Sequence, residues 1–451
     1  MLKKYLQYSS AGIVLLFVLD VLLFGHAFDR ISWALLLAGG LCFVLARYYH
    51  QTVPGIRLAG GLLLVPITAL LHLLLLVLVV LMVANSPPGK SFKPRVELVE
   101  PAGEARDAYQ QWITQLDNAQ GPCYQLPDDF LWDINKFDFT YPGFDELFTD
   151  ACLAERAHLL TFAATRQTAM PFVEIAGELA LPMEMELPAF TPLMNAFKIE
   201  TAHVVKLLAT GQAEAAGEKY LFLWQAAFQR LTAQEGLLNT MVSLATINFL
   251  ADLYGDREGA LPGVKGAALA SLLARIPAAI DASLAHAFAT EYGFQKGFIL
   301  QIATGRFGLE GEDRFLAWPL FDPYAQLQYI EEIFVDVIAI QRLKFPENSN
   351  ALAELNGKMS AFAAHPYSLV NPVGRILTAI ATPNYDSYIE RKEIIKSRII
   401  AMHYLLSFQL NDDPGSVPVD NLTGREFAVI READYFEITG QEVSFRVFVK
   451  E

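Results

Sequence analysis

Residues 207–231 read LLATGQAEAAGEKYLFLWQAAFQRL, and this stretch predicts the fold class of the larger part of the chain. Apolar residues recur there at the 3.6-residue spacing of one helix face, namely Leu221, Trp224, Phe228 and Leu231. A neighbouring face is also apolar, so this helix should be covered on both sides. Gly211 stands where a glycine commonly ends the preceding helix. We therefore predict an antiparallel pair of helices over 192–210 and 212–232.

Outward from this hairpin, the same periodicity predicts a mainly α-helical domain over residues 102–410. Further helices are expected at 101–119, 145–168, 235–254, 267–290, 322–343 and 386–409, with a short buried helix within 371–386. Residues 169–192 contain four prolines and are predicted to be an ordered loop. The result should be a solenoid-like stack of helical hairpins.

The pattern changes in the last part of the chain, 411–451. Three short runs, REFAVI, DYFEIT and VSFRVFV, are rich in β-branched and aromatic residues and are separated by turn residues. They predict a small antiparallel sheet whose apolar face packs on the helix at 386–409.

The first 85 residues differ in composition from everything that follows. Apolar segments at 11–28, 31–49 and 58–84 are each long enough to cross a bilayer, and residues 86–101 form a linker. Positive charge favours the cytoplasmic side of a membrane. The basic residues Lys3, Lys4, Arg47 and Arg57 slightly favour a cytoplasmic N-terminus, although Arg30, Lys90, Lys93 and Arg95 act in the opposite direction. We therefore predict three spans in a bacterial inner membrane, with the large C-terminal domain in the periplasm.

Charge separates the two parts as well. Residues 1–90 carry six Lys and Arg against two Asp and Glu, whereas the remainder carries 28 against 47. An acidic domain is a poor match for the phosphates of nucleic acid, so no nucleic-acid partner is expected. The lipid bilayer and a protein in the membrane or periplasm are the expected partners.

Cysteines leave two alternatives open. Cys42 lies in the second predicted span, while Cys123 and Cys152 lie early in the large domain. In an oxidising compartment the latter two would form a disulfide. The alternative is two separate buried thiols.

Motifs for catalysis are sparse, and no cofactor is predicted. Glu291, an acid late in an apolar helix, is the candidate for a general acid with a raised pKa, although a structural glutamate has the same pattern. A carboxylate cluster offers oxygen ligands for calcium but lacks the glycine turn of a calcium loop, and its candidate ligands are Asp128, Asp129 and Asp133. An ordered loop is the alternative there.

Two polar residues fall inside the predicted spans. Asp20 and His72 are costly in lipid and should face other helices or a partner. A proton relay is the alternative interpretation of this pair.

Three blocks of sequence carry a resemblance: LLATGQAEAAGEKYLFLWQ (207–225), NPVGRILTAIATPNYDSYI (371–389) and VDNLTGREFAVIREADYFEI (419–438). Their order resembles an uncharacterised class of bacterial membrane-anchored α-helical proteins of the cell envelope. The resemblance covers about residues 190–440. It implies anchoring and a helical-hairpin fold, and it brings no known activity.

These observations favour a non-enzymatic role, as a membrane-anchored scaffold or assembly protein of the bacterial cell envelope. Two alternatives stay open: an accessory subunit of a membrane transport complex, in which Asp20 and His72 would act, and a carboxylate-based envelope hydrolase that uses Glu291.

Overall fold

The computed structural model describes most of the region after residue 94. The described residues are 95–98, 100, 103–126, 145–256 (without 176, 183, 184, 186 and 234), 266–304, 321–363, 371, 374–375, 385–410, 415–432 and 435–448. The predicted spans at 11–28, 31–49 and 58–84 lie outside them. So do Asp20, His72, most of the linker and most of the predicted helix within 371–386.

The chain divides into two compact units. One comprises Met1–Lys90, Gly308–Asp322 and Pro366–Gly374, and the other comprises Ser91–Phe307, Pro323–His365 and Arg375–Glu451. The sequence pattern did not indicate that two internal segments group with the N-terminal region. Every helix and strand named below belongs to the second unit.

The described part of this unit is mainly α-helical. Its α-helices are α4 (Gly103–Asn118), α5 (Asp150–Thr165), α6 (Thr191–Ala209), α7 (Ala213–Thr232), α8 (Gly236–Asp256), α9 (Gly266–Leu273), α10 (Ile276–Thr304), α12 (Pro323–Ile340), α13 (Glu347–Ala363) and α15 (Asp386–Gln409). Two short 3-10 helices are η2 (Pro122–Tyr124) and η4 (Asp145–Phe148).

The described strands are short and all antiparallel. They are β1 (Val173–Ile175), β2 (Glu178–Ala180), β3 (Val419–Asp420), β4 (Arg425–Glu426), β5 (Ala428–Arg431), β6 (Tyr435–Thr439) and β7 (Ser444–Phe448). β1 pairs with β2, β3 pairs with β4, and the C-terminal sheet has the order β5-β6-β7. The predicted C-terminal antiparallel sheet is confirmed.

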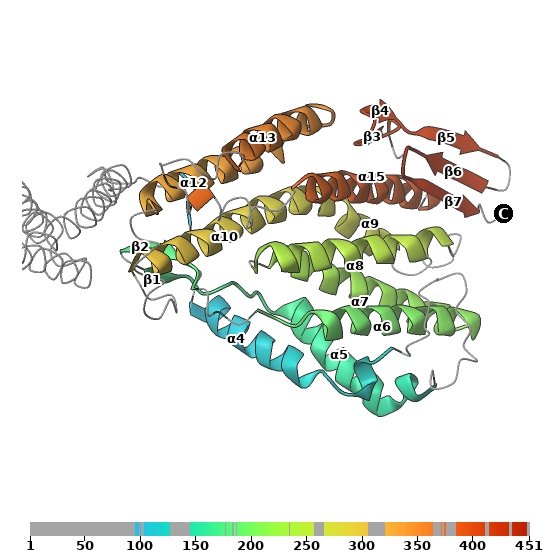
Figure 1. Cartoon of the computed structure of the whole chain (residues 1–451). Helices are drawn as coiled ribbons and strands as arrows, with labels where there is room; N and C mark the ends of the chain where they lie inside the picture. Colours follow the sequence, from blue (N-terminus) through green and yellow to red (C-terminus); the bar gives the residue numbers. More distant parts are fainter. Residues whose placement is uncertain are drawn as a thin grey trace, which may run out of the picture. The chain divides into compact units, whose positions relative to one another are not determined.

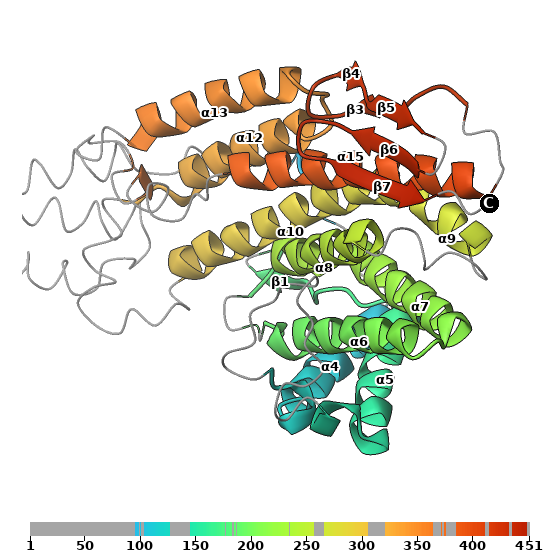
Figure 2. The same cartoon turned by 90° about the vertical axis from the view of Figure 1, so that its right-hand side faces the viewer.

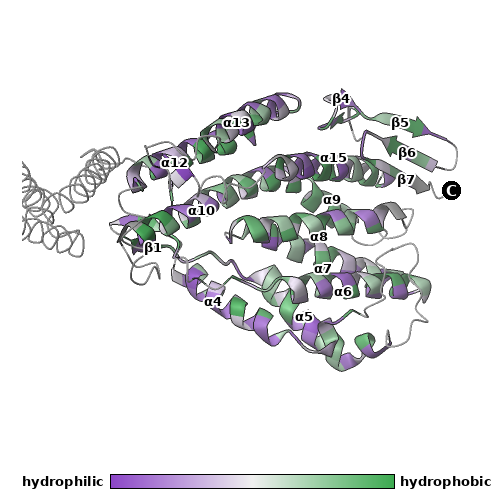
Figure 3. Cartoon of the chain, viewed as in Figure 1, coloured by the Kyte–Doolittle hydropathy of each residue, from purple (hydrophilic) through white to green (hydrophobic). Residues whose placement is uncertain are grey.

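The helices form an array in which neighbours in sequence are mostly neighbours in space. α7 packs against α5, α6 and α8, α10 packs against α8 and α12, and α13 packs on α12. α4 and α5 lie at one side of the array and α12 and α13 at the other (Figures 1 and 2). α4, at the first of these sides, carries many hydrophilic residues, whereas hydrophobic residues run along α8 in the middle of the array (Figure 3). α15 departs from the sequential order, because it packs against α8, α9 and α10.

The hairpin of α6 and α7 and the long helix α15 lie where the sequence predicts them. Tyr220, Leu223, Trp224 and Leu231 of α7 are all buried, so both of its apolar faces are covered. Gly211 between α6 and α7 has a φ of 76°, the left-handed conformation expected of a glycine that ends a helix.

The prediction of a single helix at 267–290 is wrong. The chain instead forms α9, a break, and α10, which continues to Thr304. Pro277 is the second residue of α10, and proline has no amide hydrogen and clashes with the carbonyl one turn earlier. At the break, the Arg275 amide bonds to the Leu272 carbonyl oxygen three residues back. The apolar stripe is common to both helices, which is why its periodicity hid the break.

The prolines of region 169–192 predicted an ordered loop, but the region also contains two strands. β1 and β2 form a small hairpin within it, and Gly177 at its turn has a φ of 81°. The side chains of Phe172 and Leu181, which flank the hairpin, are buried. α13 is a second element that the sequence did not predict.

Two glycines one helical turn apart allow α10 to approach this hairpin. A Cβ atom built on Gly297 would lie 1.8 Å from the Leu181 carbonyl oxygen, and one on Gly293 would lie 2.7 Å from the Phe172 ring. The Leu181 amide also donates a hydrogen bond to the Gly293 carbonyl oxygen at 3.0 Å. The close approach therefore requires the absence of a side chain at both positions.

The C-terminal sheet packs on the helices through aromatic residues. Phe436 of β6 stacks on Phe408 of α15 with ring centroids 4.1 Å apart. Phe445 of β7 meets Tyr254 of α8 edge-on at 6.3 Å. Because these side chains belong to the main hydrophobic core, the tail is part of the folded domain and not an appendage.

Apolar length alone also marks one described helix as able to span a membrane. The segment Gly236–Tyr254 of α8 passes this criterion, and the pair α9 and α10, bent by 40°, passes it if the two count as one span. Of the most apolar window of α8, 67% is buried inside the protein, which is typical of a core helix.

Candidate functional site

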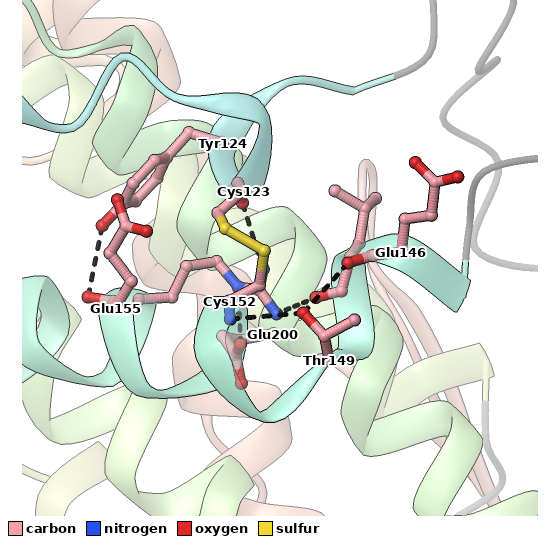
Figure 4. The surroundings of a disulfide bond; sticks show 9 residues. Cys123, Tyr124, Glu146, Thr149, Cys152, Glu155 and Glu200 are labelled. Carbon is pink, nitrogen blue, oxygen red and sulfur yellow. Dashed lines mark hydrogen bonds and ion pairs between the residues drawn. A yellow bond between two sulfur atoms is a disulfide. The ribbon is translucent and has the colours of Figure 1, made fainter.

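The structure joins Cys123 and Cys152 in a disulfide bond. Their sulfur atoms are 1.95 Å apart and their Cα atoms 5.0 Å apart. Cys123 lies in η2 and Cys152 in the first turn of α5, where the Thr149 side chain caps the helix (Figure 4). Of the two alternatives that the sequence left open, the structure has the disulfide.

Arg156 is a buried arginine whose guanidinium bonds to residues on both sides of this disulfide. Arg156 is fully buried, and its guanidinium donates hydrogen bonds to the Cys123 carbonyl oxygen at 3.0 Å and to the Leu147 carbonyl oxygen at 2.7 Å. Its Nε donates to Glu200 Oε1 of α6 at 2.7 Å. The Arg156 side chain thus connects η2, η4 and α6 beside the disulfide.

Glu200 is the charge that balances this arginine. Its carboxylate also accepts a hydrogen bond from Lys219 of α7, and His203 Nδ1 lies 3.5 Å away. Burial alone would raise the pKa of the Glu200 carboxyl. The neighbouring His203 and the cationic Lys219 and Arg156 outweigh burial and lower the pKa to about 2. Such a carboxylate stays ionised at neutral pH, which suits a structural anchor better than a proton donor.

A second buried pair lies at the turn between α7 and α8. Arg230 forms an ion pair with Glu235 and donates to Thr168 Oγ1 at 2.9 Å, and its guanidinium lies 4.5 Å from the centre of the Trp112 ring. Burial raises the pKa of the Glu235 carboxyl, against the effect of Arg230. This cluster connects α4, the first of the described helices, to the centre of the array.

Glu291, the predicted general acid, lies near the middle of α10, since that helix continues past the predicted end. Burial raises the pKa of the Glu291 carboxyl, while a hydrogen bond with Gln295 opposes that effect. Tyr385 is fully buried nearby, and its hydroxyl has no hydrogen-bond partner among the described residues. Burial and then the charge of Glu291 raise the pKa of Tyr385. Burial thus favours the protonated form of Glu291, and its neighbours Gln295 and Tyr385 are not carboxylates.

The predicted calcium ligands Asp128, Asp129 and Asp133 lie outside the described residues. Within the described part of the chain, no group of three or more His, Cys, Asp and Glu side chains is arranged to hold a metal ion.

A groove with apolar and polar walls lies between α6 and α8. Its volume is about 220 Å3, and it is lined by Met194, Phe197, Lys198, Ala245, Thr246, Asn248, Phe249 and Asp252. Both walls rest on α7, so the groove is built on packed helices and not on loops. The sequence did not reveal it, because its two walls come from helices that are not consecutive.

Arg398 of α15 fixes the polar rim of this groove. Its Nη1 donates to Asn248 Oδ1 at 2.6 Å, and its Nη2 forms an ion pair with Asp252. The same guanidinium lies 5.6 Å from the centre of the Phe445 ring in the C-terminal sheet. Arg398 of α15 therefore contacts both the rim of the groove and the C-terminal sheet.

The chain matches no family model, no curated protein and no solved structure.

Proposed function

We propose that this chain is a membrane-anchored helical interaction protein of the bacterial cell envelope, acting as a scaffold or assembly protein. The anchor is the N-terminal region with three spans at 11–28, 31–49 and 58–84, and the helical-hairpin domain lies on the periplasmic side. The interaction surface belongs to the helical array, which offers the groove between α6 and α8.

The disulfide is the observation that carries the proposal. Disulfides persist in oxidising compartments and are rare in the cytosol. Cys123 and Cys152 are bonded at the start of a domain that directly follows an apolar N-terminal region. The same compartment follows from the basic residues Lys3 and Lys4, which favour a cytoplasmic N-terminus, and an odd number of spans then leads outside.

Charge and architecture support an interaction role. The domain is acidic. Two clusters of ion pairs, one around Glu200 and one around Arg230, connect its helices to one another. These buried charges are paired within the protein, which suits a rigid frame for binding.

A topology and partner experiment tests the proposal. A reporter that is active only in the cytoplasm is fused after Glu451, and it is expected to be silent. The full-length protein is then solubilised in mild detergent and purified under native conditions, with a stoichiometric membrane or periplasmic partner expected. An active reporter would overturn the topology, and a lone monomer would overturn the scaffold role.

One observation favours a second candidate, a carboxylate-based envelope hydrolase. A general acid needs a pKa near the working pH, and burial moves Glu291 in that direction. Glycoside hydrolysis also needs a second carboxyl group roughly 5–10 Å away. The test is hydrolysis of envelope glycan by the purified protein and by its Glu291→Gln variant.

A further inference from the structure

We propose that residues 95–98 are a strap that fixes the α-helical domain to its membrane anchor, with the buried carboxylate of Glu331 in α12 as the group that holds the strap closed. This inference rests on the anchored topology proposed above and adds how the anchor and the domain are coupled. The strap and α12 belong to the same compact unit.

The Glu331 carboxylate binds the backbone of the strap. Its Oε1 accepts hydrogen bonds from the amides of Arg95 and Val96, the latter at 3.3 Å. The Arg95 Nε also lies 3.6 Å from Glu331 Oε2. The Glu331 side chain is 3% exposed, whereas that of Arg95 is 55% exposed. The buried partner in this contact is therefore the carboxylate on α12, and the strap lies against it.

The strap depends on this carboxylate because no regular structure holds its backbone. Residues 95–98 form neither helix nor strand. Val96 is 5% exposed, and a buried amide without an acceptor costs free energy. A hydrogen bond to a charged acceptor is about twice as strong as one between neutral groups. Loss of the Glu331 carboxylate should therefore free the strap from α12.

Apolar contacts extend the attachment from α12 to other elements. Leu98 packs against the hydrophobic cluster that includes Tyr109 of α4 and Phe172 beside β1. It also lies next to α10, because a Cβ atom built on Gly293 would come within 3.5 Å of a Leu98 methyl group. The strap thus contacts α4, α10 and α12, so it is attached to the frame of the domain and not to one helix alone.

The strap determines how much chain is free between the anchor and the domain. The third proposed span ends at residue 84, and α4 begins at Gly103. Without the strap, the 18 residues 85–102 would separate them, with a reach of about 65 Å for an extended chain. With the strap closed, the ten residues 85–94 remain, and the reach falls to about 36 Å. The closed strap therefore keeps the domain close to the bilayer, within reach of a partner in the membrane.

Hydrogen exchange of the full-length protein in lipid nanodiscs tests the strap, read at single residues by mass spectrometry. The amides of Arg95 and Val96 should be protected in the wild type. In Glu331→Ala they should exchange about tenfold faster or more, since a hydrogen bond to a charged group contributes at least about that factor. Glu332→Ala is the matched control, because Glu332 follows Glu331 in α12 but its side chain is 53% exposed, and this variant should exchange as the wild type does.

The amides of α7 serve as the internal check in the same experiment. They should keep their protection in Glu331→Ala. If they lose it, the variant is destabilised as a whole, and Glu331→Gln replaces it, because glutamine keeps a side-chain oxygen as an acceptor of the same shape. In Glu331→Gln the strap amides alone should exchange faster than in the wild type.

Energy transfer to the lipid tests the coupling of the domain to the anchor. A donor dye is attached to Ser360→Cys in a Cys42→Ser background, since Ser360 is exposed on α13, which packs on α12. The acceptor is carried by lipid headgroups, and the Förster distance of the dye pair lies between the two reaches given above. The efficiency should fall in the Glu331 variant, because an open strap lengthens the tether, and it should stay at the wild-type value in Glu332→Ala.

Three outcomes would overturn the inference. Unprotected strap amides in the wild type would show that no strap closes on α12, and protection that survives the loss of the Glu331 carboxylate would remove its role. Unchanged energy transfer in a variant whose strap amides exchange fast would show that the strap does not set the tether. Each result can occur while the reporter is silent and a partner co-purifies, and an active reporter can accompany a closed strap, so the two proposals fail separately.

Discussion

Replacing the Phe445 side chain in β7 by alanine should reveal whether the C-terminal sheet shares one cooperative core with the helices. Phe445 is 2% exposed, meets Tyr254 of α8 edge-on, and lies under the guanidinium of Arg398. Removing a buried phenylalanine side chain costs about 3–5 kcal/mol, because the transfer free energy and the cost of the cavity add. The Phe445→Ala variant should therefore lose a large share of the stability of a typical domain, about 5–15 kcal/mol.

The assay is urea unfolding of the full-length protein in detergent, read by pulse proteolysis. Fragments should be followed from α7 and α8 as well as from the sheet. The expected result is a single transition, shifted to lower urea in every fragment. Ile430→Ala is the matched control, since Ile430 lies on β5 of the same sheet but is 42% exposed, and it should change the midpoint little. If Phe445→Ala frees only the sheet and leaves the helices unchanged, the single-core reasoning is wrong.

Three further predictions concern Gly297, Glu200 and Glu291. Gly297→Ala should lose about 3 kcal/mol or more, since its methyl group would overlap a backbone oxygen; Gly357→Ala in α13, with nothing within 4 Å, should be neutral or up to about 1 kcal/mol more stable, and equal melting temperatures for the pair would contradict the close approach. Because the pKa of Glu200 is lowered to about 2, its stabilisation is complete above the unfolded value of about 4.5 and is lost as the pH falls toward 2. Denaturation from pH 5 to 2 should show a loss of about 3 kcal/mol in the wild type that Glu200→Gln lacks, and parallel curves would count against the anchor. Glu291 has a raised pKa, so the folded state disfavours its ionised form, and Glu291→Gln should be more stable than the wild type at neutral pH, with the gap closing as the pH falls. A Glu291→Gln variant that is less stable than the wild type at neutral pH, by a gap that shrinks as the pH falls, would show instead that the carboxylate is ionised and paired.

Local periodicity explains which parts of the fold could be predicted from the sequence. α7 and α15 were predicted with nearly their observed ends, because each carries long apolar stripes. The break between α9 and α10 was missed since a stripe continues through it, and the proline responsible, Pro277, lies inside the second helix. The hairpin of β1 and β2 was missed because its three-residue strands are too short for an alternating pattern to stand out.

The charged clusters were beyond prediction for a different reason. Arg156 and Glu200 are 44 residues apart, and Arg398 and Asp252 are 146 residues apart. Neither pair has a local signature, since each depends on how whole helices pack. The cysteines were a partial exception, because Cys123 and Cys152 are the two cysteines of the domain and could pair only with each other. The sequence left open whether they pair or stay as separate thiols, and the structure has the disulfide.

Thiol labelling during lysis of whole cells tests the central claim, a disulfide-bonded domain outside the cytoplasm. A Cys42→Ser background leaves Cys123 and Cys152 as the two remaining cysteines of the chain. Cells are lysed in denaturant with a polyethylene-glycol maleimide, with and without prior reduction, and the protein is followed by its shift in gel mobility. The account predicts no shift without reduction and a double shift after it. A double shift without reduction would contradict the account, because it would show two free thiols and a domain in a reducing compartment.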